Sequence, residues 1–316
     1  MSDQTIAKQV ILGTAQLGLS IMDQLVAQGK PVTLVNRRGK VNEPLPAGVN
    51  VVQGDVLDVD AVARLCADAE VVFFCAQPPY TEWPERWPPL MQAVLAGVAQ
   101  TKAKLVFGDN LYMYGPTQGQ PLHEDLPYAA TGRKGKTRAQ VAQMVLDAHK
   151  AGRVQAVLGR AADFYGPRVY NALFSDAWFK AALAGKTVNL LGNLDLPRTY
   201  SYIKDYARGL VTLSEHDEAF GRAWHVPNAA PVTTRQFVKM IEAEIGKPIK
   251  VRVAGRWLLA AIGLFNAQLR EMNEMMYEFE EPYIVDHSQF AAAFGDQSTS
   301  HKQAIRETVA WVRQRM

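Results

Sequence analysis

A short run of small residues near the start of the chain has the composition of a phosphate-binding loop. Residues 13–18 read G-T-A-Q-L-G, so that Gly13 ends an apolar run and Gly18 opens a helical pattern. Small side chains let the backbone approach a pyrophosphate, which the N–H groups of a helix N-terminus then bind. Ala15 stands at the middle glycine of the G-x-G-x-x-G spacing, so an ordinary strand–helix turn is the alternative. The residues predicted to hold the phosphates are Gly13, Thr14, Ala15, Gln16 and Leu17.

Basic residues after the second apolar run indicate which dinucleotide this loop would hold. Asn36, Arg37 and Arg38 stand where an acidic residue would grip an adenosine ribose. The planar fork of an arginine pairs with a 2′-phosphate, and the missing carboxylate removes a repulsion. The pattern therefore favours NADP(H) over NAD(H), with a solvated basic turn as the alternative. Asp55, after the third apolar run, could accept a hydrogen bond from the adenine amino group or only shape a turn.

The elements that must hold these residues alternate between strands and helices. Apolar runs predict strands, and spacing near 3.6 predicts the helices between them. The predicted strands lie in 8–13, 32–36, 49–55, 70–76, 103–109 and 153–167, and the predicted helices in 18–30, 58–69, 89–101 and 136–150. Unbroken apolar strands that alternate with helices favour a parallel sheet covered on both faces. We therefore predict an α/β protein with a Rossmann-type, doubly wound parallel sheet.

The alternation changes after residue 167. The predicted domains are a dinucleotide-binding domain at 1–167, to which 200–228 returns, and a smaller mixed substrate-binding domain at 168–199 and 229–316. The second domain contains an aromatic helix in 172–186 and an amphipathic helix followed by a strand in 233–253. It also includes the segment G-R-W-L-L-A-A-I-G-L-F-N at 255–266.

Bulk composition excludes several classes of protein. A formal net charge of +3 is too small to predict a nucleic-acid or membrane partner. The only two cysteines, Cys66 and Cys75, lie in apolar surroundings and are typical of core thiols in a reducing compartment. The N-terminal residues lack the apolar core of a signal peptide, and no apolar run is long enough to span a membrane. We therefore expect a cytoplasmic protein. Its scattered histidines lack ligand spacing, and we expect no metal site.

Taken in order, these motifs resemble those of the extended and atypical short-chain dehydrogenase/reductases, the NAD-dependent epimerase/dehydratase family. The resemblance is carried by G-T-A-Q-L-G (13–18), G-D-V-L-D (54–58), F-F-C-A-Q (73–77), G-D-N-L-Y-M-Y-G-P (108–116), G-R-A-A-D-F-Y-G-P (159–167) and R-T-Y-S-Y-I-K-D-Y-A-R-G (198–209). It implies a cofactor-binding parallel sheet, a small C-terminal substrate domain and an active site in the cleft between them. It implies further cofactor contacts at Asp55, Val56, Cys75, Ala76, Gln77, Lys136, Ala162 and Phe164.

The chain departs from this family where a proton must move. Alignment on Tyr114 puts Asn110 at the place of the substrate-polarising serine or threonine. An amide can donate a hydrogen bond to a carbonyl, but it cannot relay a proton. In the family's Tyr-x-x-x-Lys pattern, the lysine contacts the nicotinamide ribose, while the tyrosine gives or takes the proton. Lys136 matches that lysine, whereas Gly132 replaces the tyrosine.

Two other phenols are candidates for the missing acid. Tyr128 precedes Gly132 and Gly135, which disfavour a helix there, so a bent loop could turn its hydroxyl inward. Tyr112 lies two residues after Asn110 and shares its face if that segment is extended. We rank the two nearly equal, and simple packing is the alternative role for each.

Other residues suggest how a substrate would be held. Arg198 corresponds to a family arginine that often contacts a diphosphate or another anion of the substrate. Positive charge also gathers in 133–138, which would attract an anionic substrate. The loop 77–90 contains five prolines and two tryptophans and places Tyr80 and Trp83 as possible walls of a substrate pocket, with packing as their other use.

Two functions follow from these patterns. The first is an NADP(H)-dependent oxidoreductase or epimerase-like enzyme that acts on a small carbonyl or alcohol. In it, Lys136 would hold the ribose, Asn110 would polarise the oxygen, and a displaced tyrosine or water would carry the proton. The second is a non-catalytic NADP-binding protein that senses redox state or has a regulatory role. The family resemblance also implies a monomer or a homodimer, with the helix in 136–150 available for the dimer contact.

Overall fold

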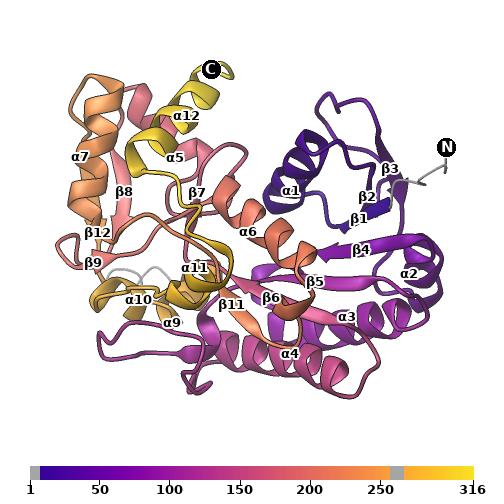
Figure 1. The fold of residues 1–316 in the computed structure, drawn as a ribbon. Helices are drawn as coiled ribbons and strands as arrows, with labels where there is room; N and C mark the ends of the chain where they lie inside the picture. The colour runs from indigo at the N-terminus through magenta and orange to yellow at the C-terminus, as the bar shows by residue number, and fades with distance from the viewer. Residues whose placement is uncertain (1–7, 257–266) are drawn as a thin grey trace. The chain divides into compact units, whose positions relative to one another are not determined.

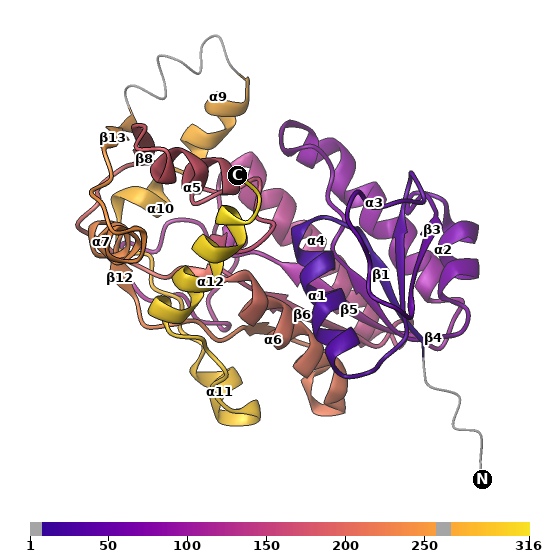
Figure 2. The same cartoon turned by 90° about the horizontal axis from the view of Figure 1, so that it is seen from above.

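The computed structural model describes residues 8–256 and 267–316, and Figures 1 and 2 show its ribbon from two directions. Contacts divide the chain into two compact units. The sheet unit comprises Met1–Asn110, Lys136–Arg160 and Tyr206–Trp224, and the second unit comprises Leu111–Gly135, Ala161–Asp205 and His225–Met316. This division differs from the boundaries predicted from the sequence, because 111–135 and 161–167 belong to the second unit.

The sheet unit is built on one seven-stranded sheet with the strand order β11-β6-β5-β4-β1-β2-β3. The strands are β1 Lys8–Leu12, β2 Val32–Asn36, β3 Val49–Gln53, β4 Ala69–Phe74, β5 Lys104–Asp109, β6 Ala156–Arg160 and β11 Ala223–His225. From β3 to β6 every neighbouring pair is parallel. Strands β4, β5 and β6 are buried along almost their whole length, which is why their sequences are continuous apolar runs.

Helices cover both faces of this sheet. On one face lie α1 (Gln16–Ala27) and α6 (Ile203–Glu215), because a Cβ added at Gly108 of β5 would contact Leu17 and Tyr206. On the other face lie α2 (Val59–Cys66), α3 (Trp83–Val98) and α4 (Arg133–Lys150), where Phe107 meets Trp87 of α3 at 5.8 Å between ring centroids. The predicted doubly wound arrangement is confirmed, and both layers can be followed in Figure 1.

The start of α3 differs from the sequence-based expectation. The segment 77–90 was expected to be a proline-stiffened loop, but the 3-10 helix η1 (Tyr80–Glu82) runs directly into α3 at Trp83. Pro88 and Pro89 lie inside α3 and each removes one backbone donor. The helix persists because Trp83, Trp87 and their neighbours are buried against the sheet, and burial of a large aromatic side chain contributes about 2 kcal/mol.

The second unit is mixed. Its strand pairs are β7 (Phe164–Tyr165) with β10 (Ser201–Tyr202), β8 (Val188–Leu191) with β13 (Val251–Ala254), and β9 (Pro197–Arg198) with β12 (Val232–Thr233). Its helices are α5 Asp176–Leu183, α7 Thr234–Ile245, α9 Ala267–Glu274, α10 Tyr277–Glu280, α11 Ser288–Phe294 and α12 His301–Arg313, and η2 (Tyr112–Tyr114) is a 3-10 turn. Its aromatic core includes Phe174, Trp178, Tyr200 and Phe237. The predicted helix and strand in 233–253 are confirmed.

Two sequence features lie outside the described residues. They are the N-terminal segment 1–7 and most of the apolar segment 255–266. Within 8–256 and 267–316, no helix combines the length and apolarity needed to span a bilayer, and no three histidine, cysteine, aspartate or glutamate side chains gather as metal ligands.

Candidate functional site

The glycine loop lies at the carboxyl end of β1, where the sheet continues into α1. Gly13 has φ +113°, and a Cβ there would lie 2.5 Å from the backbone nitrogen of Ala76. A Cβ at Gly18 would collide with the carbonyl oxygen of Gly13. The backbone of β4 approaches from the other side, because the N–H groups of Cys75 and Ala76 both donate to the Leu12 carbonyl at 2.9 Å. Both glycines are therefore required by close backbone packing.

The first turn of α1 has the features of a phosphate site. The N-cap residue Ala15 makes no side-chain cap hydrogen bond, and no acidic side chain lies in the first turn. A helix N-terminus carries a partial positive charge and unsatisfied N–H groups. The loop from Gly13 to Leu17 leaves these groups without a side-chain cap, so the residues present fit a dinucleotide pyrophosphate.

Among the predicted ribose-binding residues, Asn36 makes hydrogen bonds that order the turn, and Arg37 and Arg38 are exposed. Asn36 donates from Nδ2 to Thr14 Oγ1 at 2.8 Å, and its Oδ1 accepts from the Arg38 N–H at 2.8 Å. Asn36 thus ties the end of β2 to the glycine loop. Arg37 and Arg38 are exposed, and within the described residues neither guanidinium is held in an ion pair. Both remain available to an external anion.

The other predicted cofactor residues of the sheet unit have varied surroundings. Asp55 is exposed and accepts from the Leu57 N–H at 3.0 Å, so it shapes a turn after β3; the adjacent Val56 is half-buried. Cys75 is half-buried and Gln77 is exposed. Burial raises the pKa of the Cys75 thiol well above its ordinary range, which favours the protonated thiol.

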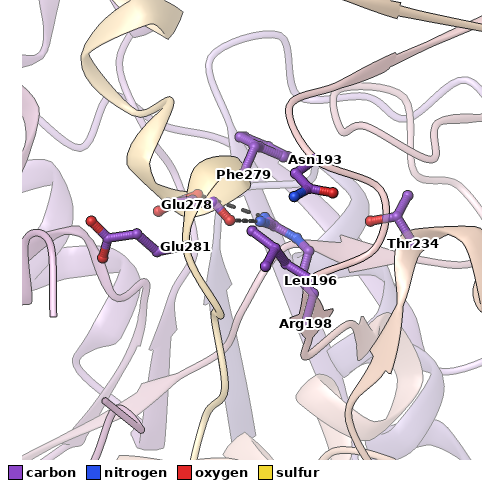
Figure 3. A pocket seen from close by; sticks show the side chains of 7 residues that line it. All are labelled: Asn193, Leu196, Arg198, Thr234, Glu278, Phe279 and Glu281. Atoms are coloured by element: carbon purple, nitrogen blue, oxygen red, sulfur yellow. Dashed lines mark hydrogen bonds and ion pairs between the residues drawn. The ribbon is translucent and has the colours of Figure 1, made fainter. Parts of the chain in front are cut away.

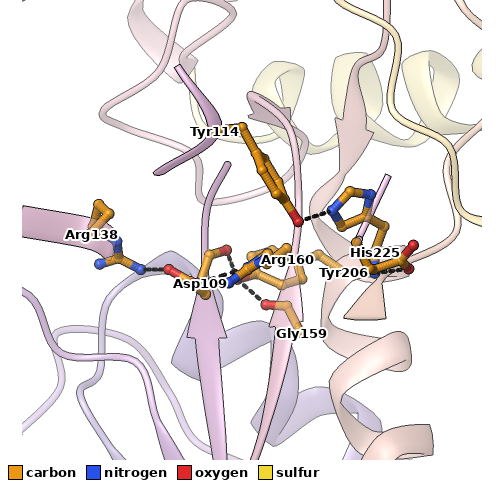
Figure 4. Close-up of polar contacts among 8 residues, drawn as sticks. Asp109, Tyr114, Arg138, Gly159, Arg160, Tyr206 and His225 are labelled. Carbon is orange, nitrogen blue, oxygen red and sulfur yellow. Dashed lines mark hydrogen bonds and ion pairs between the residues drawn. The ribbon is translucent and has the colours of Figure 1, made fainter. Parts of the chain in front are cut away.

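A buried charge cluster closes the carboxyl end of β5, next to Asn110. Asp109 accepts hydrogen bonds from Arg138 of α4 and, at 3.0 Å, from Nε of Arg160 (Figure 4). All three side chains are at most 3% exposed. Tyr206 donates to the Asp109 carbonyl at 2.7 Å. These contacts hold the backbone that carries the half-buried Asn110. Ligands of open parallel sheets bind beyond the carboxyl ends of the strands, which is where Asn110 lies.

Helix α4 presents different cations on its two faces. Lys136 is exposed, whereas Lys134 and Arg138 are buried. Residues four apart share a helix face, and residues two apart do not. Lys134 and Arg138 therefore stand on the inward face one turn apart, while Lys136 stands on the outward face. The Arg138 guanidinium also lies 4.7 Å from the Trp87 ring centroid.

The first residues of α4, up to Gly135, belong to the second unit, and a carboxylate of that same unit caps them. Glu274 of α9 accepts from the Lys134 N–H at 2.8 Å, and a Cβ at Gly132 would collide with the same carboxylate. Lys134 Nζ pairs with Glu271 Oε2 at 2.9 Å. Gly132 thus leaves room for Glu274, so a tyrosine at this position would require the carboxylate to move.

A cavity of about 100 Å³ lies beside this turn within the second unit, and Tyr112 lines it. Its other lining residues are Gly115, Pro116, Ala130, Thr131, Gly132, Gly135, Glu274, Met275 and Tyr277. A Cβ at Gly135 would lie 2.6 Å from the Tyr112 carbonyl oxygen, so this glycine lets the 112–114 turn pack against α4. The condition under which Tyr112 would share a face with Asn110, an extended segment, is not met, because Tyr112–Tyr114 is a 3-10 turn.

The competing phenol has different surroundings. Tyr128 is half-buried and meets the Tyr114 ring at 6.0 Å in a T-shaped contact. Tyr114 is itself buried and hydrogen-bonded at 2.9 Å to Nε2 of His225 (Figure 4). Helix α4 begins at Arg133, and it therefore includes Gly135 but not Tyr128. The segment that carries Tyr128 is irregular, as expected. Tyr128 does not line the cavity.

The remaining predicted residues lie mostly in buried or packed positions. Trp83 is 4% exposed and donates from its indole to the Pro78 carbonyl at 3.2 Å, while the half-buried Tyr80 packs on it at 5.1 Å. Ala162 is buried and donates its N–H to Ser201 at 3.0 Å; Phe164 is half-buried. The ligand roles of these residues stay predictions.

Arg198 lies in a buried ionic cluster of the second unit (Figure 3). Its guanidinium donates to Asp163 and to the Glu278 carbonyl, and lies 3.8 Å from the Glu278 carboxylate. The Phe279 ring centroid is 4.1 Å away. Burial, and then the charge of Asp163, raise the pKa of Glu278 to about 8, against the opposing effect of Arg198. Burial therefore favours the protonated form of Glu278.

Sequence reasoning missed the residues that partner these cations. These partners are carboxylates that lie far along the chain from the lysine, the arginines or the helix end that they contact. They are Asp109, Asp163, Glu271, Glu274 and Glu278. Lys134 and Arg138 could have been identified, because the helical period places them on the same face as the apolar Val141 and Val145.

Comparison with known proteins identifies the relatives of this chain. A sequence model of the NAD dependent epimerase/dehydratase family matches residues 10–226. The 2-alkyl-3-oxoalkanoate reductase of Shewanella oneidensis is 25% identical over an alignment of 289 residues that covers 85% of this chain and 73% of that protein. The UDP-glucose 4-epimerase of Azospirillum brasilense is 25% identical over 99% of this chain and 89% of that protein.

Solved structures show the same fold. The UDP-glucuronic acid 4-epimerase from Bacillus cereus, in complex with NAD, has a TM-score of 0.77 at 18% identity and covers 97% of this chain and 99% of its own. The dTDP-glucose 4,6-dehydratase from Streptomyces venezuelae has a TM-score of 0.79 at 16% identity, with 97% of both chains covered. The family match and the curated relatives support the expected NAD(P)-dependent enzyme class. Because the family match covers most of its length, this chain belongs to the NAD-dependent epimerase/dehydratase family.

Proposed function

We propose that this enzyme is an NADP(H)-dependent oxidoreductase that acts on a small carbonyl or alcohol substrate. The observation that carries the proposal is the uncapped N-terminus of α1, tied by Asn36 to a turn with two exposed arginines, Arg37 and Arg38. A pyrophosphate fits the first feature, and a 2′-phosphate fits the second. The Shewanella relative, whose name describes the reduction of a 3-oxo group, supports a carbonyl substrate.

NADP(H) would be held by the loop 13–17, with Arg37 and Arg38 at its 2′-phosphate, and would supply or accept the hydride. Asn110, which follows the Asp109 cluster, would donate an amide hydrogen bond to the substrate oxygen. That bond favours the charge that develops on the oxygen during reduction. The buried ion pairs of Asp109 would hold Asn110 in place.

For proton transfer we favour Tyr112 over Tyr128. Tyr112 lines the cavity beside the first turn of α4, whereas Tyr128 packs against Tyr114. A phenol at a cavity wall can reach a bound alcohol or carbonyl, and proton transfer by such a group contributes about 10²- to 10⁴-fold in rate. The exposed Lys136 remains a proposed ribose contact, because Lys134 and Arg138 are buried and paired with carboxylates.

The decisive experiment joins cofactor binding to turnover. NADPH and NADH are titrated by fluorescence, and NADPH oxidation is then followed with aldehydes, ketones and 3-oxo acids. We expect NADPH to bind and at least one carbonyl class to be reduced. If the protein binds neither NADPH nor NADH, the proposal is refuted. If it binds a coenzyme but turns over none of the compounds, the non-catalytic alternative is favoured.

Tyr112→Phe is the variant that tests the proton donor. It removes one hydroxyl and is expected to lower kcat about 10²-fold or more while the Kd of NADPH stays unchanged. Tyr128→Phe is the matched control and should keep kcat within about threefold. If instead Tyr128→Phe loses the activity and Tyr112→Phe keeps it, the assignment is reversed.

A further inference from the structure

The surroundings of Arg198 bear on the class of substrate. Arg198 ends β9 and is only 3% exposed. One terminal nitrogen donates to the Asp163 carboxylate and the other to the Glu278 carbonyl. Binding of a diphosphate by arginine uses the two-pronged donor fork. Here both prongs already have partners inside the protein.

The charge around Arg198 is also balanced. Asp163 lies at the guanidinium, and the Glu278 carboxyl group is 3.8 Å from it. With Glu278 protonated the cluster is neutral, and with Glu278 ionised it carries a negative charge. Glu281 lines the same depression. A diphosphate would therefore meet no net positive charge from this group, and would have to displace the half-buried Asp163 carboxylate from its partner.

The space beside Arg198 is limited as well. The depression lined by Asn193, Leu196, Thr234 and Phe279 encloses no room for a water-sized molecule. Of the three guanidinium nitrogens of Arg198, Nε is the one that is buried without a hydrogen-bond partner. One N–H can hold one acceptor oxygen. The cavity of about 100 Å³ beside Tyr112 is the larger opening within the same unit.

Building on the proposed function, we infer that Arg198 is an internal counter-ion for Asp163, held in place by Glu278, and that the substrate is a carbonyl compound without a nucleoside diphosphate. Because both terminal nitrogens of Arg198 already have partners inside the protein, the arginine disfavours substrates that carry a diphosphate. This separates the chain from relatives whose names specify UDP- or dTDP-sugars.

Binding of UDP and UDP-glucose to the wild-type protein tests the inference directly. Both are titrated by calorimetry with saturating NADP⁺, after binding of NADP⁺ itself has been measured. We expect Kd values above about 1 mM for both. A Kd below about 0.1 mM for either nucleotide would overturn the inference. If both NADP⁺ and UDP-glucose bind, only this inference fails. If neither NADP⁺ nor NADPH binds, the proposed function itself fails.

A pair of variants tests the counter-ion role without any ligand. Arg198→Met strands buried carboxyl groups, so its Tm should fall by more than about 5 °C. Arg235→Met, which removes an arginine from the exposed pair with Asp195, should change Tm by less than about 2 °C. An unchanged Tm for Arg198→Met would overturn the role. If this variant does not fold, Asp163→Asn provides the same comparison, and it should lower Tm because it weakens the same pair.

Discussion

At the scale of single residues, the cofactor preference depends on two side chains. Arg37 and Arg38 are exposed, and the turn that carries them is ordered by Asn36. We predict that Arg37→Ser combined with Arg38→Ser weakens NADPH binding about 10- to 100-fold, because the 2′-phosphate loses its charged donors. The measurement is a fluorescence titration of NADPH and NADH with each protein.

NADH is the internal control for this double variant, since it has no 2′-phosphate. Its Kd should change by less than about threefold. Equal losses for both coenzymes would show that the arginines support the loop rather than recognise the phosphate. An unchanged NADPH affinity would place the recognition elsewhere.

At the scale of elements, helix α4 separates two lysines that are two residues apart in sequence. Lys134 is buried and paired with Glu271, while Lys136 is exposed. We predict that Lys134→Met lowers the free energy of unfolding by about 3 kcal/mol, because it leaves a largely buried carboxylate without its close partner. Lys136→Met should change it by less than about 0.5 kcal/mol. Urea unfolding measures both values.

Turnover of the same two variants then tests the sequence-based assignment of Lys136. Loss of kcat in Lys136→Met, with its stability kept, would support a ribose contact from the outward face of α4. If Lys136→Met is fully active, the lysine of the family pattern has no counterpart at this position. Equal stability of the two variants would contradict the helix faces described above.

The sequence predicted the elements of the sheet unit better than its charged contacts. Strands such as β4 are continuous apolar runs with a clear pattern, and Asp58, an N-cap residue type, caps α2 by accepting from the Ala61 N–H at 3.0 Å. By contrast, the helix beginning at Trp83 contains prolines that indicate a loop, and only burial of its tryptophans offsets them. The carboxylate at Gly132 comes from residue 274, a distance along the chain that no local pattern covers.

At the scale of the whole molecule, one buried carboxyl group makes folding stability depend on pH. The pKa of Glu278 is raised from 4.5 to about 8, first by burial and then by Asp163. Between these values the folded chain keeps a proton that the unfolded chain has released. The folded state therefore binds more protons. The contribution of Glu278 to stability is complete below about pH 4.5 and is lost as the pH rises to about 8.

Glu278→Gln isolates this effect, since glutamine resembles the protonated acid and does not titrate. We predict that, relative to the variant, the wild-type protein loses on the order of a few kcal/mol of unfolding free energy between about pH 5 and pH 8. Urea unfolding of both proteins across this range gives the difference. Because carboxylates elsewhere, such as Glu242 and Asp286, have lowered pKa values and titrate in both proteins, they cancel in the comparison. A difference that stays constant with pH, or grows in favour of the wild type, would mean that Glu278 is ionised inside the folded chain and that the Arg198 cluster carries a net negative charge.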